Sequence, residues 1–300
     1  PPHASPLGPH PSPPPYAESH LPSPRGTLHL PSPATCWHCV KAMHRYIVHR
    51  RLGCGFGGEC VLAEEREARG GRRRSCVLKR VPLASLSRRS RRRALLEAHI
   101  LQSLEHPNVL RIRRAFVHED HLVIDTAFCD AGDLEVLIAR RRELAKGCRR
   151  GFSEAAALGV LVQALRGARY IHGREVVHRD LKASNVLLTH DGVVLLGDFG
   201  VARVLPRGRD AEAGRVVGSV SHWPPEVCGG GACTKPGDCW ALGVLLYTLC
   251  ALRLPFAGSC ALAVVLSITE GRPAPLPSAY SRGLHDLCAA LLRVDPAPPL

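Results

Sequence analysis

Between residues 46 and 127 the apolar positions form short runs separated by glycines and charged residues, a pattern typical of β-strands. One stretch in this part differs, because Leu95, Ile100, Leu101 and Leu104 fall on one side of a helix over 91–104. Strands are predicted at 46–48, 60–62, 76–81, 109–117 and 121–127. The first part of the chain is therefore predicted to be a sheet with one helix.

Beyond residue 133 the apolar spacing becomes mainly helical. Helices are predicted at 134–145, 153–172, 238–252, 259–270 and 281–293, with two short strands at 186–188 and 193–195. The most apolar of these helices is predicted to be buried, because it contains Gly243, Tyr247 and Thr248 and is shorter than a membrane span. The fold class predicted is α+β, a small antiparallel β lobe followed by a larger helical lobe.

The N-terminal segment has a different composition. Residues 1–35 hold twelve of the 25 prolines, which predicts a disordered or polyproline-like tail over 1–39. The folded domain is expected over 40–300, with lobes at 40–128 and 129–300. Because the chain stops soon after Asp295 and Pro296, its C-terminal end is interpreted as truncated.

The formal charge of +14 suits anionic partners without selecting one. Only 5% of the residues are aromatic, and no basic strand carries stacking residues, so a nucleic-acid partner is not favoured. The alternative interpretation, an RNA-binding protein, rests only on this charge. Thirteen scattered cysteines and the lack of a signal peptide favour an intracellular, cytoplasmic location.

One run of residues carries most of the predicted chemistry, namely His178-Arg179-Asp180-Leu181-Lys182-Ala183-Ser184-Asn185. Asp180 could accept the proton of a substrate hydroxyl, and Lys182 could neutralise a transferring phosphoryl group. Asn185, together with Asp198 of Asp198-Phe199-Gly200, offers oxygen ligands suited to Mg²⁺ and unlike zinc ligands. This run predicts phosphoryl transfer with a bound Mg²⁺.

A second group of residues lies upstream. Gly53, Gly55 and Gly58 form a loop whose backbone could approach phosphates, although a glycine cluster alone is a weak signal. Lys79 lies in an apolar strand and needs an anionic partner, for which Glu97 of the following helix is predicted. Lysine is rare here, five of 40 basic residues, yet Lys79 and Lys182 occupy the two proposed phosphate-contact positions.

In this order and spacing the motifs resemble the protein kinase superfamily over about residues 46 to 295. Pro224-Pro225-Glu226 stands where that family has A-P-E, and Asp238-Cys239-Trp240 resembles its helix start that anchors the catalytic loop. Lys182, two residues after Asp180, and Ser219, after Gly218, resemble the residues that serine/threonine kinases have at these positions. Gly197-Asp198-Phe199-Gly200 with the residues after it, and Asp130-Ala131-Gly132-Asp133-Leu134, resemble the NIMA-related kinases.

The resemblance implies a serine/threonine kinase that transfers the γ-phosphate of ATP to protein substrates. It places the adenine between the lobes, near Cys60, against backbone groups of Ala127 and Cys129, and above Leu187. It also implies that Lys79, held by Glu97, grips the α- and β-phosphates.

The sequence departs from the family pattern in three places, and the first two favour a pseudokinase scaffold as the alternative. Gly57 takes the place of the usual aromatic residue at the glycine-loop tip, with Cys60 where valine is usual. The segment 201–218 contains no Ser, Thr or Tyr, and Arg215 stands at the usual phosphorylation position. Asp210 or Glu212 is the hypothetical phosphate mimic. Finally, Glu226 is expected to be buried without its usual arginine partner.

Two further features are read as structural. Cys36 and Cys39 have a C-x-x-C spacing, but no second pair supplies the other zinc ligands. The arginine runs 88–93 and 140–150 are interpreted as solvated helix faces rather than binding surfaces.

Overall fold

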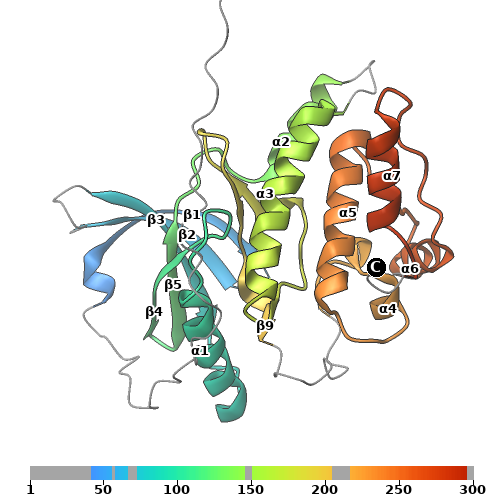
Figure 1. The fold of residues 1–300 in the computed structure, drawn as a ribbon. Helices are drawn as coiled ribbons and strands as arrows, with labels where there is room; N and C mark the ends of the chain where they lie inside the picture. The colour runs from blue at the N-terminus through green and yellow to red at the C-terminus, as the bar shows by residue number, and fades with distance from the viewer. Residues whose placement is uncertain (1–41, 56–57, 67–72, 146–150, 205–216, 296–300) are drawn as a thin grey trace, which may run out of the picture. The chain divides into compact units, whose positions relative to one another are not determined.

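The computed structural model describes residues 42–55, 58–66, 73–145, 151–204 and 217–295. The predicted tail over 1–39 and the Cys36/Cys39 pair lie outside these residues. Within the described part, a short 3-10 turn at Met43–Arg45 leads into the first strand. The strands and helices occur in the order predicted, with most strands first and most helices afterwards (Figure 1).

Five antiparallel strands form the main sheet, in the order β1-β2-β3-β5-β4. They are β1 Tyr46–Gly55, β2 Gly58–Glu65, β3 Arg74–Pro82, β4 Ile112–His118 and β5 His121–Ala127. A helix, α1 Arg88–Gln102, lies between β3 and β4 in the chain and packs against β4. Ser87 caps α1, because its side chain accepts a hydrogen bond from the Ser90 backbone.

The two faces of this sheet bury different clusters because side chains alternate along each strand. One face carries Leu78, Val61 and Phe116, packed with Tyr46 of β1 and with Ala42 and Met43 just before that strand. The opposite face packs on α1 through residues such as Leu122, Val117 and Ala98. Lys79 follows Leu78 in β3 and therefore points away from the first cluster.

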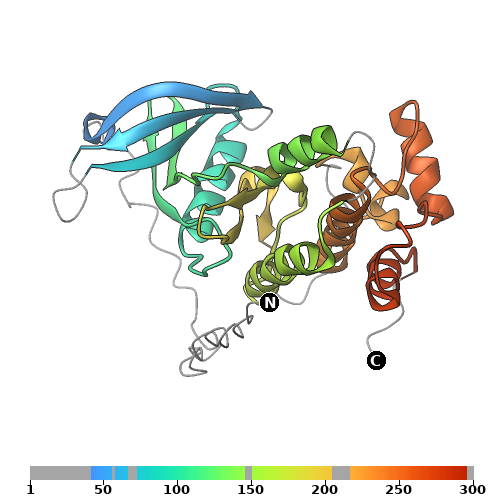
Figure 2. The ribbon, with the colours of Figure 1, turned by 90° about the horizontal axis from the view of Figure 1, so that it is seen from above.

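The remaining chain is mainly helical (Figure 2). Its helices are α2 Leu134–Leu144, α3 Glu154–His172, α4 Pro225–Cys228, α5 Lys235–Ala251, α6 Ala261–Glu270 and α7 Arg282–Leu291. The short strands are β6 Val176–Val177, β7 Val186–Leu188, β8 Val194–Leu196 and β9 Arg203–Val204. Pairing joins β6 to β9 and β7 to β8.

Helix α5 is the centre of the helical core. It is buried on all sides, packs on α3 and α7, and stacks Trp240 on Phe256 with ring centroids 5.5 Å apart. This confirms the prediction that the apolar run near residues 240–252 is a buried helix. Among the described residues, no helix has the length and apolar character needed to cross a membrane.

Each predicted strand and helix has a counterpart among the described elements. The short elements β6, β9 and α4 were missed, because two to four residues are too few to show a period. The arginines at 88, 89 and 92 and at 140–142 lie exposed on α1 and α2, in agreement with the predicted solvated helix faces, whereas 146–150 of the second run lie outside the described residues.

Candidate active site

The loop after β6 is fixed to the start of α5 by one buried carboxylate. Asp238, only 1% exposed, accepts hydrogen bonds from the backbone N–H groups of His178 and Arg179, at 2.8 and 2.9 Å. Its Oδ2 also lies 2.7 Å from Nε2 of His172. Arg179 has a positive φ of 67°, a strained conformation that these bonds hold in place.

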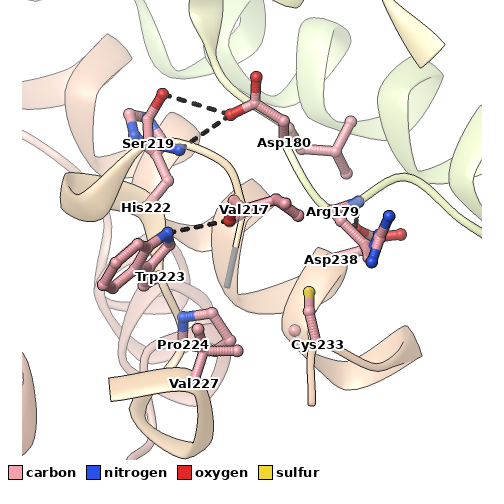
Figure 3. Close-up of a pocket in the computed structure, with 13 residues that line it drawn as sticks. Arg179, Asp180, Val217, Ser219, His222, Trp223, Pro224, Val227, Cys233 and Asp238 are labelled. Atoms are coloured by element: carbon pink, nitrogen blue, oxygen red, sulfur yellow. Dashed lines mark hydrogen bonds between the residues drawn. The ribbon is translucent and has the colours of Figure 1, made fainter. Parts of the chain in front are cut away.

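Asp180, at the end of this loop, is surrounded by donors. Its Oδ1 accepts from the backbone N–H and the hydroxyl of Ser219 at 3.0 and 3.2 Å, as Figure 3 shows. Its Oδ2 pairs with Lys182 at 2.8 Å and accepts from the Asn185 amide at 3.1 Å. The Lys182 ammonium also donates to the Ser219 hydroxyl at 2.9 Å. The structure thus brings the predicted residues Asp180, Lys182 and Asn185 together around one carboxylate.

A pocket lies beneath Asp180, between this loop and the segment that carries Ser219 (Figure 3). Its lining residues include Val217, His222, Trp223, Val227, Cys233 and Ala241. Burial, with a smaller contribution from Lys182 and against the attraction of Asp180, lowers the pKa of His222 to about 4. Burial raises the pKa of Cys233 to about 12, so the thiol stays protonated. Sequence reasoning missed His222 and Cys233, because neither lies in a recognisable motif.

Lys79 reaches from β3 to Asp198, and the two side chains form an ion pair. Burial would raise the pKa of Asp198, but Lys79 and the Gly200 backbone N–H hold it below its usual value. Asp198 therefore stays ionised, as a metal ligand must. The sequence predicted Glu97 as the partner of Lys79, whereas the structure pairs this lysine with Asp198; Glu97 has an interaction of its own.

The glycine loop lies between β1 and β2, with its tip at 56–57 outside the described residues. Gly58 has a φ of +114°, and a Cβ there would lie 2.2 Å from the Arg80 carbonyl oxygen. Only glycine fits this position. Cys60 is opposite both Gly53 in β1 and Lys79 in β3, so this thiol lies between the glycine loop and the lysine.

The two residues predicted to contact a nucleobase lie at the end of β5 and just after it. Ala127 is half-buried and ends β5, whereas Cys129 is buried and accepts a backbone hydrogen bond from Gly132. Leu187 follows in β7 and packs near Gly197. Burial raises the pKa of Cys129 to about 11, which agrees with its interpretation as a packing residue.

The start of the segment after Asp198 is tied to the catalytic loop. Arg179 donates from its guanidinium to the carbonyl oxygen of Val201, and β9 pairs with β6 just beyond it. Asp210, Glu212 and Arg215 lie outside the described residues, so the phosphate-mimic hypothesis stays a prediction.

The environment of Glu226 differs from the prediction. Its side chain is exposed rather than fully buried, although partial desolvation still raises its pKa. Within the described ranges no cation forms an ion pair with it. Because water reaches the carboxylate, the large penalty expected for a buried unpaired charge does not apply.

The comparisons with known proteins agree with this geometry. A family model described as protein kinase domain matches residues 46–298. The chain is 34% identical over 255 residues to the human "Serine/threonine-protein kinase Nek5", covering 85% of this chain and 34% of that protein. It is 32% identical to Nek11 of Macaca fascicularis, covering 84% and 39%, and 34% identical to mouse Nek3, covering 85% and 47%.

The match over most of the chain shows the family. This protein belongs to the protein kinase family, and its two-lobed α+β fold is a kinase fold. The resemblance to the NIMA-related kinases is confirmed by the Nek relatives. The chain spans about a third to a half of the length of the relatives described above.

Proposed function

We propose that the protein is a serine/threonine kinase that transfers the γ-phosphate of ATP to protein hydroxyl groups. The observation that carries this proposal is the arrangement around Asp180, where Lys182, Asn185 and Ser219 all contact one carboxylate. Lys182 is 27% exposed, so an incoming substrate can reach it. A carboxylate with only a structural role would not require such an accessible lysine beside it. The Nek relatives are named serine/threonine kinases, which supports the choice of acceptor.

Each residue in this arrangement has a role that is set by its position. Asp180 orients the acceptor hydroxyl and takes its proton, because an ionised carboxylate that can exchange one of its donors for the substrate hydroxyl is a suitable base. Lys182 offsets the charge that develops on the transferring phosphoryl group. Ser219 donates two hydrogen bonds to Asp180 and thereby holds the base toward the acceptor.

The proposal includes Mg²⁺ and ATP as cofactor and phosphoryl donor. Asp198 is ionised and Asn185 has an amide oxygen, so both fit a hard cation that prefers oxygen ligands. A bound Mg²⁺ would neutralise the phosphate charge. Lys79 would contact the α- and β-phosphates, and pairing of Lys79 with Glu97 stays a prediction for the nucleotide-bound protein. The glycines at 53, 55 and 58 would cover the phosphates.

The adenine would lie against the connection after β5. The proposed contacts are the backbone groups of Ala127 and Cys129, with Cys60 above the ring and Leu187 below it. We also keep the domain limits as a proposal, with a proline-rich tail over 1–39 and lobes at 40–128 and 129–300.

The first experiment is phosphate transfer from labelled ATP, with Mg²⁺, to a Ser/Thr peptide pool and to a generic basic protein. Asp180→Asn keeps the size of the side chain and removes its basicity, so transfer should fall by about 10²- to 10⁴-fold. A matched control is Asp191→Asn, which changes an exposed aspartate between β7 and β8. A folded, ATP-binding protein without transfer would instead support the scaffold alternative.

A further inference from the structure

Four charged side chains and a tyrosine form a group with two buried carboxylates and two half-buried arginines, on the sheet face opposite Lys79. They are Asp125, Glu65, Arg113, Arg114 and Tyr46. Asp125 is completely buried, and Glu65 is 3% exposed. The Tyr46 hydroxyl donates to Asp125 Oδ2 at 2.9 Å, and the Arg114 guanidinium binds both Tyr46 and Glu65. Buried charges are costly even when paired, so this group, which we call the β5 charge cluster, requires an explanation beyond stability.

The member closest to the proposed nucleotide site is Arg113. Ile112 is opposite Thr126 and Arg114 is opposite Asp125, so Arg113 is an extra residue in β4, a β-bulge. The bulge directs its side chain back along the strand pair. Arg113 Nη2 donates to the Thr126 carbonyl oxygen at 2.6 Å and lies 3.1 Å from Asp125 Oδ1.

This bond fixes the strand immediately before the proposed adenine contacts. Successive carbonyl groups along a β-strand point to opposite sides. When Arg113 holds the Thr126 carbonyl toward β4, the next carbonyl, that of Ala127, is directed to the other side. Ala127 is the residue that would accept a hydrogen bond from the exocyclic amine of adenine.

We propose that Arg113 is a positioning residue for purine recognition: from outside the nucleotide site it holds the Thr126–Ala127 peptide so that the Ala127 carbonyl faces the base. Asp125 holds Arg113 in turn, and Tyr46 and Arg114 keep Asp125 in place. The inference rests on the proposed nucleotide-binding function. It concerns the 6-amino group of adenine, not the phosphates, which Lys79 would contact from the other face of the sheet.

The experiment compares binding of Mg-ATP and Mg-ITP to the full chain by calorimetry. Inosine has a carbonyl in place of the 6-amino group, so it cannot donate to Ala127. Arg113→Met should weaken ATP binding about tenfold and leave ITP binding within about twofold, which removes the preference for ATP. Arg113→Lys, which keeps the positive charge beside Asp125, should retain part of the preference.

The matched control is Arg111→Met. Arg111 lies two residues away, is 62% exposed and pairs with Glu105 at the surface, so its loss should leave both affinities unchanged. Should Arg113→Met fail to fold, as judged by its melting temperature, the same ratio is measured with Arg113→Lys.

Equal weakening of both nucleotides would assign Arg113 a merely structural role and overturn the inference. So would an unaltered protein that binds ATP and ITP equally, or that binds neither. Binding is measured separately from phosphate transfer, so the two proposals can fail independently. If the protein transfers no phosphate but Arg113→Met removes its preference for ATP, the kinase proposal is contradicted and this inference is supported.

Discussion

The catalytic loop and the strand lysine that faces it are held in different ways. Around the loop, Asp180 and Asp238 are both surrounded by donors from the helical part of the chain, and each makes several hydrogen bonds. Lys79 has a single ion pair among the described residues, with Asp198, which lies 119 positions away in the sequence. The loop geometry is therefore fixed redundantly, whereas the position of Lys79 depends on one contact.

Because of this difference, we expect substitutions in the two regions to affect different properties of the protein. Substitutions at Lys79 and Asp198 should mainly change phosphate transfer, because Mg²⁺ and phosphates must replace the protein partners there. Substitutions around Asp238 should mainly change the stability of the loop. Four substitutions, taken from the largest expected effect to the smallest, test this division.

Asp198→Asn should give the largest loss of transfer, about 10³-fold, because a metal ion contributes several kcal/mol of charge stabilisation and the amide binds it weakly. The free energy of unfolding should fall by only about 1 kcal/mol, because the Asp198 side chain is 47% exposed. Steady-state transfer and chemical denaturation measure the two effects. A variant with full transfer, while Asp191→Asn is also unchanged, would exclude Asp198 as a metal ligand.

Asp238→Asn should be the most destabilising of the four. The substitution removes the charge of a buried carboxylate that accepts hydrogen bonds from two backbone N–H groups. One of these N–H groups would then face the NH₂ group of the asparagine. We expect a loss of about 3 kcal/mol in urea denaturation, with a smaller effect on transfer by the folded fraction. Asp286→Asn, at an exposed position on α7, should change stability by less than about 0.5 kcal/mol. Similar losses in both variants would contradict the anchoring role of Asp238.

Gly218→Ala tests how closely the segment before Ser219 approaches the loop. Gly218 has a φ of +88°, and a Cβ there would lie 2.6 Å from the Arg179 carbonyl oxygen. Gly230→Ala is the matched control, since its φ of +85° is similar but no atom lies within 4 Å of the added carbon. Gly218→Ala should be less stable than this control by about 1–2 kcal/mol and should transfer phosphate more slowly. Equal stability would mean that the segment can move away from the loop.

The catalytic loop could be predicted from the sequence because its residues are close together. Asp180, Lys182 and Asn185 lie within six positions, so a loop of almost any shape brings them near one another. The partner of Lys79 could not be predicted in the same way. Glu97 and Asp198 are both acidic groups at a distance, and the choice between them depends on how α1 packs, which no sequence period specifies.

The β5 charge cluster was missed for a related reason. Arg113 and Arg114 lie in a chain with 40 basic residues, most of them arginine, so neither stands out. Their role depends on the β-bulge at Arg113, which shifts the strand register by one position. Alternating patterns predict that a strand exists but not where an extra residue enters it.

The smallest effect concerns pH. His222 has a pKa of about 4 in the folded protein, against 6.5 for an unperturbed histidine. Between these values the unfolded chain binds a proton and the folded protein does not, so stability is fully present above about pH 6.5 and is lost as the pH falls toward 4.

His222→Gln should therefore show a flatter decline of the unfolding free energy over this window than the unaltered protein, by up to 1.36 kcal/mol per pH unit. Urea denaturation at a series of pH values measures the slope, with His190→Gln at an exposed position as the control. The two charged groups that act on His222 are Asp180 and Lys182, so the slope also reports on the catalytic loop. If His222→Gln and His190→Gln have the same slope, the histidine is solvated in the folded protein, and the pocket beneath Asp180 is open to water.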